Sequence, residues 1–262
     1  MNNDLLNKIE ITSFLKTKEK VDICVLKEVD STNNYLKREA KSGIKQCKVL
    51  IAESQTAGRG RLERRFYSPE NSGIYMSILC FPKLDAKLSV LITALTAVAV
   101  SDAVFLLTGK LPKIKWVNDL ILNKKKLCGI LTEGAIKPNS AELEWAVVGI
   151  GINIYPPKDG FNKEIEQIAT YLLDDKKENL KNRLIAEILN RFFDLLEDLE
   201  EKSFIEAYKE RSFVLNKEIN VIKADGVKKA TALDIDQNCR LLVEYENKEK
   251  EYLSSGEISI KF

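Results

Sequence analysis

The chain has 262 residues, of which 45% are hydrophobic and 31% charged, and its 41 Lys and Arg against 39 Asp and Glu leave a net charge of +2. This balance is typical of a folded protein, and it excludes global disorder and a strong overall field toward nucleic acid or a membrane. A chain of this length buries roughly three quarters of its surface on folding, so it can hold a core without disulfides. We expect one large domain or two smaller ones.

The sequence contains no histidine, and this absence excludes many kinds of site. Ser-His-Asp and Cys-His nucleophiles, histidine general bases and histidine-ligated zinc are ruled out. Charge must therefore be stabilised by Lys, Arg, backbone amides or a hard cation. The five cysteines are odd in number and form no C-x-x-C pair, which is typical of reduced thiols in a cytoplasmic protein.

The first part of the chain predicts three strands and one helix. The opening 20 residues are polar and lack the apolar stretch of a secretory signal. Apolar-rich runs predict strands at 22–29, 49–53 and 73–81. Asp30-Ser31-Thr32 supplies N-cap residues for a helix over 33–41, which Gly43 ends. A polar loop with two glycines and four arginines follows at 54–69.

Residues 88–107 form an apolar run that is long enough to cross a bilayer. Asp102 lies inside this run with two serines and two threonines, and a central Asp costs about 2.5–3.5 kcal/mol on membrane-insertion scales. Small residues in such numbers suit a helix that packs against protein. We therefore expect a buried core helix and keep a membrane span as the alternative.

The remaining sequence predicts short strands, then helices, then strands again. The first strands lie at 113–116, 120–122, 127–133 and 142–154, with a turn at Asn118-Asp119 and a hairpin tip at 123–126. Helical spacing of apolar residues predicts helices at 179–199 and 204–211. Five short runs from 218 onward predict a small SH3-like β-barrel. The pattern is α+β, a mixed β-sheet flanked by helices, with domains expected at 1–214 and 215–262.

The most informative segment for function is the loop 54–65, which carries four arginines and one glutamate around two glycines. Arginine binds phosphate or carboxylate through a planar fork, and glycine lets the backbone approach a ligand closely. The segment lacks the Gly-Lys-Ser/Thr of a Walker A loop. It predicts a clamp for an anionic, phosphate-bearing ligand, and a solvated basic loop is the alternative.

Two further segments carry candidate site residues. Lys126 follows a lysine-rich turn and enters an apolar strand, where its ammonium can be aimed at a phosphoryl or acyl oxygen. Trp116 is expected in the core, and Asn118-Asp119 in a turn. The segment 147–154 predicts a buried strand whose glycines admit close backbone approach, and no helix follows it as in a dinucleotide-binding fold.

Taken in order, these segments resemble the biotin protein ligases. The matching blocks are Asp30-Ser31-Thr32-Asn33, the loop 53–61, Lys115-Trp116-x-Asn118-Asp119, Lys126-Leu127-x-Gly129-Ile130-Leu131-x-Glu133, Gly149-Ile150-Gly151-Ile152-Asn153 and Gly256-Glu257-Ile258-Ser259. The resemblance covers residues 22–262 and implies a catalytic fold like that of class II aminoacyl-tRNA synthetases. It implies a ligase that converts biotin and ATP into biotinyl-5′-AMP and then acylates one lysine of a carrier domain. Such chemistry needs positioning and charge neutralisation, which a protein without histidine can supply.

The resemblance also implies roles for individual residues. Contacts to biotin are expected from Ser31, Thr32, Asn33, Gln55, Gly58, Arg59, Gly60, Arg61, Lys126 and Gly129. Contacts to the nucleotide are expected from Arg61, Arg64, Phe66, Asn118, Asp119, Lys126 and Asn153. Lys126, Arg59 and Arg61 are the expected catalytic residues. Mg²⁺ is expected to bind mainly through the ATP phosphates, with Asn118 and Asp119 as candidate ligands.

The expected partner is the biotin carboxyl carrier protein domain of acetyl-CoA carboxylase or of a related biotin enzyme. The resemblance implies a cytoplasmic monomer or homodimer that binds no membrane. About 21 residues precede the first matching strand, too few for a three-helix DNA reader, so we expect no repressor activity. A lipoate-type ligase and a non-catalytic biotin sensor are the alternatives. The sequence departs from the family pattern at Leu62 and Glu63, inside the arginine loop, and at Val117, where proline is usual.

Overall fold

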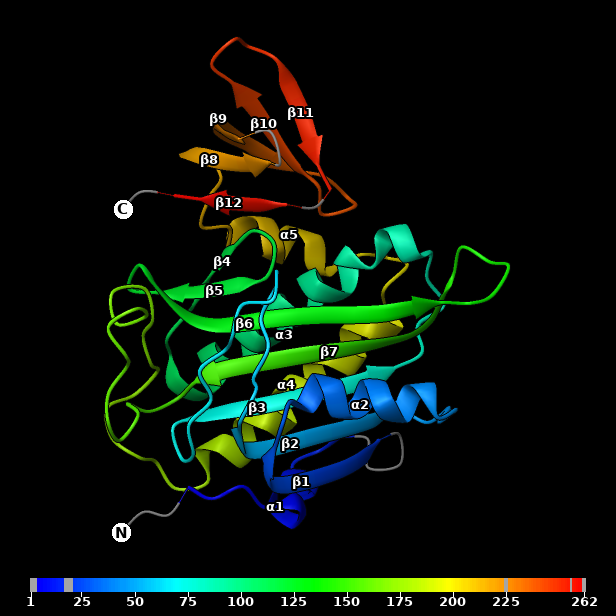
Figure 1. Ribbon diagram of the computed structural model, residues 1–262, viewed down its shortest axis with the longest axis vertical. Helices are drawn as coiled ribbons and strands as arrows, with labels where there is room; N and C mark the ends of the chain where they lie inside the picture. Colours follow the sequence, from blue (N-terminus) through cyan, green and yellow to red (C-terminus); the bar gives the residue numbers. More distant parts are fainter. Residues whose placement is uncertain (1–3, 17–20, 224–225, 255, 261–262) are drawn as a thin grey trace.

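A seven-stranded mixed sheet forms the centre of the molecule (Figure 1). The computed structural model describes residues 4–16, 21–223, 226–254 and 256–260. The sheet contains β1 (Asp22–Val29), β2 (Lys48–Gln55), β3 (Gly73–Cys80), β4 (Lys113–Lys115), β5 (Asp119–Leu122), β6 (Lys125–Ile136) and β7 (Leu143–Asn153), in the order β1-β2-β3-β7-β6-β5-β4. Only β1 and β2 pair in parallel among these strands, and every other neighbouring pair is antiparallel.

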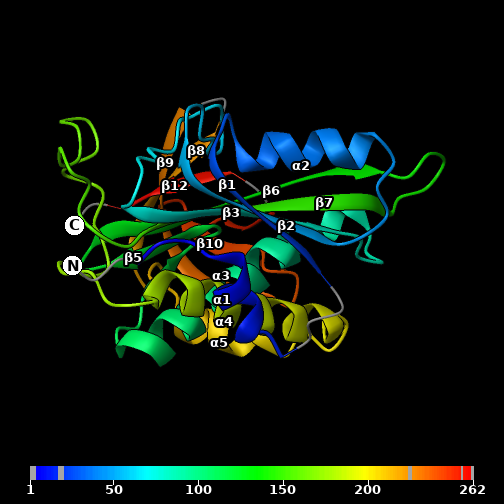
Figure 2. The same ribbon diagram turned by 90° about the horizontal axis from the view of Figure 1, so that it is seen from below.

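Helices cover both faces of this sheet (Figure 2). α2 (Thr32–Lys41) lies alone on one face, where its Leu36 packs with Leu50, Leu79 and Val147 of the sheet. The other face carries α1 (Lys8–Ser13), α3 (Val90–Thr108), α4 (Leu180–Glu197) and α5 (Phe204–Glu210). A short 3₁₀ helix, η1 (Ala86–Leu88), leads into α3. The sheet is therefore the middle layer of three, and its two faces bury separate apolar clusters.

The apolar run that could have spanned a membrane is a helix of the protein core. It is the one helix of the described residues with the length and composition of a span, Ala86–Thr108, and 72% of its most apolar 18-residue stretch is buried inside the fold. Asp102 does not face an apolar layer, because it pairs with Arg191 of α4 at 2.9 Å and with Arg211 at 2.6 Å. The expected core helix is confirmed.

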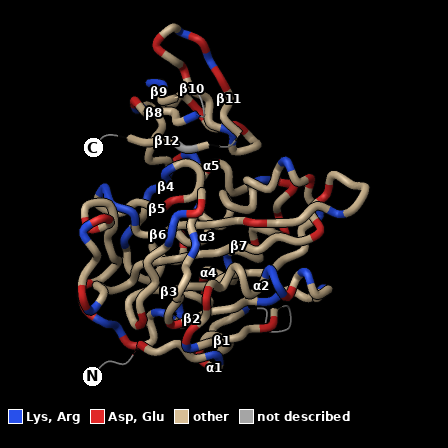
Figure 3. Tube along the Cα trace, viewed as in Figure 1, with Lys and Arg blue, Asp and Glu red and all other residues tan. Residues whose placement is uncertain are grey.

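A second, antiparallel sheet of five strands lies beyond the β4 edge of the first (Figure 1). Its strands are β8 (Glu218–Lys223), β9 (Gly226–Ile235), β10 (Leu241–Tyr245), β11 (Lys250–Leu253) and β12 (Glu257–Ser259), in the order β11-β10-β9-β8-β12. Basic and acidic residues occur in both sheets (Figure 3). The connections of the two sheets contact each other, since Trp116 Nε1, between β4 and β5, donates a hydrogen bond of 2.8 Å to the carbonyl of Cys239, between β9 and β10. The α+β class with a small C-terminal β structure is confirmed.

Two local predictions need correction. The hairpin tip is Asn123-Lys124 alone, because both residues have positive φ, 51° and 64°, and so form the two-residue turn that suits the twist of paired strands. Lys125 and Lys126 consequently belong to β6. The opening residues, for which no element was predicted, contain α1, whose first turn is capped by Asn7. Six residues are too few to show a helical period in the sequence.

Candidate active site

A cavity of about 470 Å³ opens above the centre of the large sheet. Its wall is built from the start of α2, the arginine loop, strands β3 and β5–β7, the segment after Pro157 and the residues that follow Gly256. Seven basic side chains and one acidic side chain line it: Arg59, Arg61, Arg64, Arg65, Lys115, Lys124, Lys126 and Asp119. The chain as a whole carries only +2, so basic charge is concentrated at this cavity. Such a wall favours an anionic ligand.

One group of residues in the cavity wall is polar and uncharged. Thr32, at the first turn of α2, donates from its backbone amide to Gln55 Oε1 at 2.9 Å, and Gln55 Nε2 donates to Ser68 Oγ at 2.9 Å. Ser31 caps the helix by accepting from the amide of Asn34. Backbone amides at a helix start and fixed side-chain amides suit a neutral ligand group with several hydrogen-bonding atoms.

Asn33 differs from the neighbouring residues because its side chain is already engaged by the protein. Its Nδ2 donates to the Leu131 carbonyl at 3.2 Å and to Glu133 Oε2 at 3.0 Å. Its Oδ1 accepts from Ser77 Oγ at 2.6 Å. Both amide hydrogens are used, so Asn33 supports this polar group of residues and has little left for a ligand.

Two glycines of β7 allow neighbouring side chains to reach the cavity floor. A Cβ on Gly149 would collide with the buried amide of Asn33, and a Cβ on Gly151 would collide with the Phe66 ring. Phe66 in turn lies edge-on to Tyr75, with ring centroids 6.4 Å apart. The expected close approach at these glycines is therefore confirmed, and the floor depends on the lack of side chains there.

The arginine loop closes as a tight turn despite having no glycine at its tip. The amide of Gly60 donates to the Arg64 carbonyl at 2.7 Å, and that of Arg64 donates to the Arg61 carbonyl at 3.1 Å. Leu62 and Glu63 take φ values of 52° and 59°. Left-handed conformation costs residues with a Cβ about 1–2 kcal/mol each. The departure from the family pattern thus keeps the turn and adds backbone strain.

The arginines of this loop are held by partners that are far away in the sequence. Arg59 Nη1 donates to Asn34 Oδ1 at 2.9 Å and to Glu133 Oε1 at 3.0 Å. Arg61 donates to Asn118 Oδ1 at 3.0 Å and to the carbonyl of Gly256 at 2.6 Å. Arg61 therefore connects the loop to the segment that leads into β12, and neither Arg59 nor Arg61 is a freely solvated side chain.

Glu133 is the acidic centre of the Arg59 contact. Lys37 Nζ lies 2.6 Å from its carboxylate, and Asn33 also donates to it. Burial opposes ionisation of Glu133, but these hydrogen bonds and the charges of Lys37 and Arg59 outweigh burial and lower the pKa of Glu133 below its usual value. The carboxylate is thus charged and holds Arg59 at the cavity wall.

Lys126 enters the cavity from β6 and is held at both its backbone and its amine. Its Nζ lies 2.7 Å from Asp119 Oδ1, on the neighbouring strand β5. Its amide donates to the Ile168 carbonyl at 2.7 Å, and its carbonyl accepts from the amide of Thr170 at 2.9 Å. The sequence-based expectation of an aimed lysine agrees with this geometry.

The structure gathers nearly all the expected residues around one cavity. Those that line it are Ser31, Thr32, Asn33, Gln55, Arg59, Gly60, Arg61, Arg64, Phe66, Asn118, Asp119, Lys126, Gly129 and Asn153. Gly58 is the exception: it is buried, and a Cβ there would collide with the Phe66 carbonyl and Ser68. Gly58 therefore shapes the loop without lining the cavity.

Several lining residues were not predicted as part of a site. Phe161, Ile165, Ile168 and Ala169 come from the connection between β7 and α4, for which the sequence predicted no element. Ile258, Ser259 and Ile260 come from the end of the second sheet. Trp116, expected in the core, is 3% exposed and also lines the cavity. The tail block Gly256-Glu257-Ile258-Ser259 was the one sequence signal for these contacts.

The described residues around the cavity form no preformed cage for a metal ion. No group of three or more Asp, Glu, Cys or His side chains that could bind a metal occurs among the described residues. Asp119 is the single carboxylate of the described lining, and it is paired with Lys126. Mg²⁺ takes oxygen ligands and often keeps substrate phosphates among them. These residues fit an ion that arrives bound to phosphate.

Comparison with known families agrees with this geometry. A model of the biotin/lipoate A/B protein ligase family matches residues 25–153, and a model of the biotin protein ligase C-terminal domain matches residues 214–261. The first match contains the α2 start, the arginine loop and Lys126. The second contains the strands that bring Ile258 to the cavity. The resemblance inferred from the sequence blocks is confirmed.

Individual relatives give the same result. The bifunctional ligase/repressor BirA of Bacillus spizizenii is 34% identical over 168 residues, so the match spans 64% of this chain and about half, 51%, of that protein. The biotin–[acetyl-CoA-carboxylase] ligase of Mycobacterium tuberculosis is 33% identical over 181 residues, 63% of this chain and 61% of that one. The biotin protein ligase of Aquifex aeolicus, solved with biotin and ATP, has a TM-score of 0.72 at 28% identity and covers 91% of this chain and 97% of its own.

Proposed function

The chain belongs to the biotin/lipoate A/B protein ligase family, and on this basis we propose that it is an ATP-dependent biotin protein ligase. In the first step a carboxylate oxygen of biotin attacks the α-phosphorus of ATP, which gives biotinyl-5′-AMP and releases pyrophosphate. In the second step the amine of a carrier lysine attacks the acyl carbon, so that an amide forms and AMP leaves.

The observation that carries this proposal is that one cavity combines neutral polar groups with basic ones. The neutral group of Ser31, Thr32 and Gln55 suits a ring that carries both donors and acceptors, such as the ureido ring of biotin. The basic wall of the cavity suits triphosphate and adenylate. Both ligands share one cavity of about 470 Å³, within the range of pockets for molecules of this size. The acid and the nucleotide can therefore meet within it.

Catalysis in this proposal depends on charge neutralisation. Lys126 would face the carboxyl oxygen and the α-phosphate, where negative charge grows during the attack. Arg59 and Arg61 would close the loop over the adenylate. Arg64, Phe66, Asn118, Asp119 and Asn153 would surround the nucleotide. Because these side chains already hold contacts in the protein, they need to move little during the reaction.

Mg²⁺ enters the proposal together with ATP. When bound it would neutralise phosphate charge, and Asp119 and Asn118 are the residues of the described cavity wall that could contact it. The charge of the cavity wall supports this interpretation, since its lysines and arginines offer cations for the remaining phosphate oxygens.

The acceptor belongs to the proposal as well. We propose a lysine on the biotin carboxyl carrier protein domain of acetyl-CoA carboxylase or a related enzyme, supported by the name of the Mycobacterium tuberculosis relative. Action in the cytoplasm without DNA or membrane binding stays a prediction, as does the choice between monomer and homodimer. Residues 1–214 and 215–262 are proposed as the two domains, which is supported by the separate sheets and by the C-terminal match from 214.

The deciding experiment is ATP-dependent transfer of biotin to a purified carrier domain, with lipoate and octanoate as competing acids. Transfer of biotin that requires ATP and Mg²⁺ and resists the competitors supports the proposal. Preferred transfer of lipoate would support the lipoate-type ligase of the same family. Tight biotin binding without adenylate formation would support a sensor instead.

A further inference from the structure

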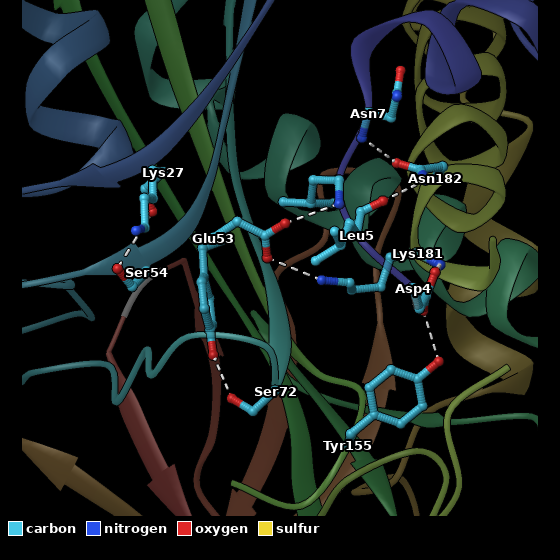
Figure 4. A network of polar contacts seen from close by, with 12 residues as sticks. Asp4, Leu5, Asn7, Lys27, Glu53, Ser54, Ser72, Tyr155, Lys181 and Asn182 are labelled. Atoms are coloured by element: carbon cyan, nitrogen blue, oxygen red, sulfur yellow. Dashed lines mark hydrogen bonds and ion pairs between the residues drawn. The ribbon is translucent and has the colours of Figure 1, made fainter. Parts of the chain in front are cut away.

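A buried ion pair joins two parts of the chain that are distant in sequence (Figure 4). Lys181 Nζ, from the first turn of α4, lies 3.0 Å from Glu53 Oε2 of β2. The Lys181 side chain is 1% exposed and that of Glu53 is 12% exposed. Neither residue lines the cavity, and the chemistry proposed above uses neither.

The N-terminal segment is held by the same pair. The amide of Leu6 donates to the other oxygen of Glu53 at 2.8 Å. Asp4 accepts from the backbone amide of Lys181 at 3.0 Å, and so supplies an acceptor at the α4 start, whose own cap residue, Asn179, makes no side-chain cap bond. Residues 4–6 are thereby fixed against both β2 and α4.

Asp4 extends this network to a second strand of the cavity. Tyr155 OH donates to Asp4 Oδ2 at 2.7 Å, just past the end of β7. Burial and the Asp4 carboxylate raise the pKa of Tyr155, so the hydroxyl keeps its proton and can donate. Asn7 and Asn182 add a further contact of 2.9 Å between the segment and α4.

Glu53 and Tyr155 each lie close in sequence to a residue that lines the cavity. Glu53 is two residues before Gln55, which receives the amide of Thr32, and Tyr155 is two residues after Asn153, which lines the cavity. A shift in register or position at the end of β2 or β7 would therefore move Gln55 or Asn153, which line the cavity. Two charges are costly to bury before they pair, and in some proteins such a pair is kept because it specifies geometry.

We propose that Glu53 and Lys181, together with the N-terminal residues 4–7, form a positioning element that sets Gln55 and the start of α2 for binding the neutral ring of the substrate. The inference rests on the proposed function, because the ring is taken to be that of biotin. Glu53 and Lys181 are positioning residues in this account and touch no substrate.

The test uses substitutions that separate charge from shape. Glu53→Gln keeps an acceptor for the Leu6 amide and removes the carboxylate charge. Lys181→Arg keeps the cation and is the conservative variant. The double variant Glu53→Gln/Lys181→Met buries no unpaired charge, so it is the one to use if the single Glu53 variant fails to fold.

Asp102→Asn is the matched control. It disrupts another partly buried pair, that with Arg191 and Arg211 in the helix layer, and none of these three residues lines the cavity. It should lower the melting temperature while leaving biotin affinity unchanged. Comparing it with Glu53→Gln separates loss of stability from loss of positioning.

Two readouts are measured on the full chain at a temperature well below unfolding. The calorimetric Kd for biotin should rise about tenfold in Glu53→Gln and in the double variant. The KM for ATP should stay within about twofold in both. Lys181→Arg should bind biotin as the wild-type protein does. Without ligand, hydrogen exchange at the amides of Thr32 and residues 55–57 should be faster in Glu53→Gln than in Asp102→Asn.

Unchanged biotin Kd together with unchanged exchange at Thr32 in a folded Glu53 variant would overturn the inference. If the wild-type protein fails to bind biotin, the proposed function is wrong instead. In that case the exchange readout still decides whether the pair positions Gln55, because it needs no ligand.

Discussion

Lys126 and Asp119 form an ion pair of 2.7 Å across neighbouring strands of the large sheet, at the wall of the cavity. Strand pairing places the two residues, since β5 and β6 are antiparallel and joined by a two-residue turn. The pair holds a long, flexible side chain in one direction. An incoming oxyanion would then meet an amine that is already oriented.

The first prediction concerns this amine. Lys126→Met keeps the aliphatic stem and removes the charge, so the rate of adenylate formation should fall about 10²–10³-fold because the developing negative charge loses its cation. Release of pyrophosphate in a single turnover measures this step. Lys125→Met is the control, since the amine of Lys125 contacts the Glu166 carbonyl outside the cavity lining. An equal loss in both variants would contradict a specific role for Lys126.

The second prediction concerns the cavity floor. Gly149→Ala places a methyl group against the Asn33 amide, whose bonds to Leu131, Glu133 and Ser77 leave it no alternative position. We expect the free energy of unfolding to fall by about 1–3 kcal/mol, as for other overpacked sites. Gly60→Ala is the control for stability, because its methyl group would meet only ordinary contacts with Arg64. Denaturant titration of both variants measures the difference. Equal midpoints would show that the Asn33 side chain can move to accept the methyl group.

The third prediction concerns pH. The pKa of Glu133 is lower in the folded protein than its ordinary value of 4.5. Its contribution to stability is therefore complete above about pH 4.5 and is lost as the pH falls through the folded pKa, when the carboxylate takes up a proton. Thermal melts between pH 7 and pH 3 should show a smaller loss of stability on acidification in Glu133→Gln. Parallel curves for the two proteins would contradict this assignment.

The fourth prediction concerns the contact between the two sheets. Trp116→Phe removes the indole donor and leaves the Cys239 carbonyl without that partner in a buried place. The free energy of unfolding should fall by about 1–3 kcal/mol, and hydrogen exchange should increase at residues 236–241. Trp145→Phe is the control: Trp145 is buried in the cluster beneath α2, so it should affect stability without that local change in exchange.

Much of the local structure could be predicted from sequence alone. The strand 22–29 and the helix capped by Ser31 were placed correctly because alternation and capping act over a few residues. α1 was missed because six residues carry too little periodicity to stand out. The lining role of Phe161 and Ile168 was missed because the segment after Pro157 shows no pattern that tells where it returns.

What the sequence by itself determined is the set of elements, the family and the chemical character of the arginine loop and Lys126. These follow from residue types at short, fixed spacings. The tertiary structure alone decided which groups meet: Arg61 with Gly256, 195 residues apart, and Lys181 with Glu53, 128 apart. Contacts over such separations depend on how whole layers pack, and many pairings of the same local patterns would satisfy the sequence equally well.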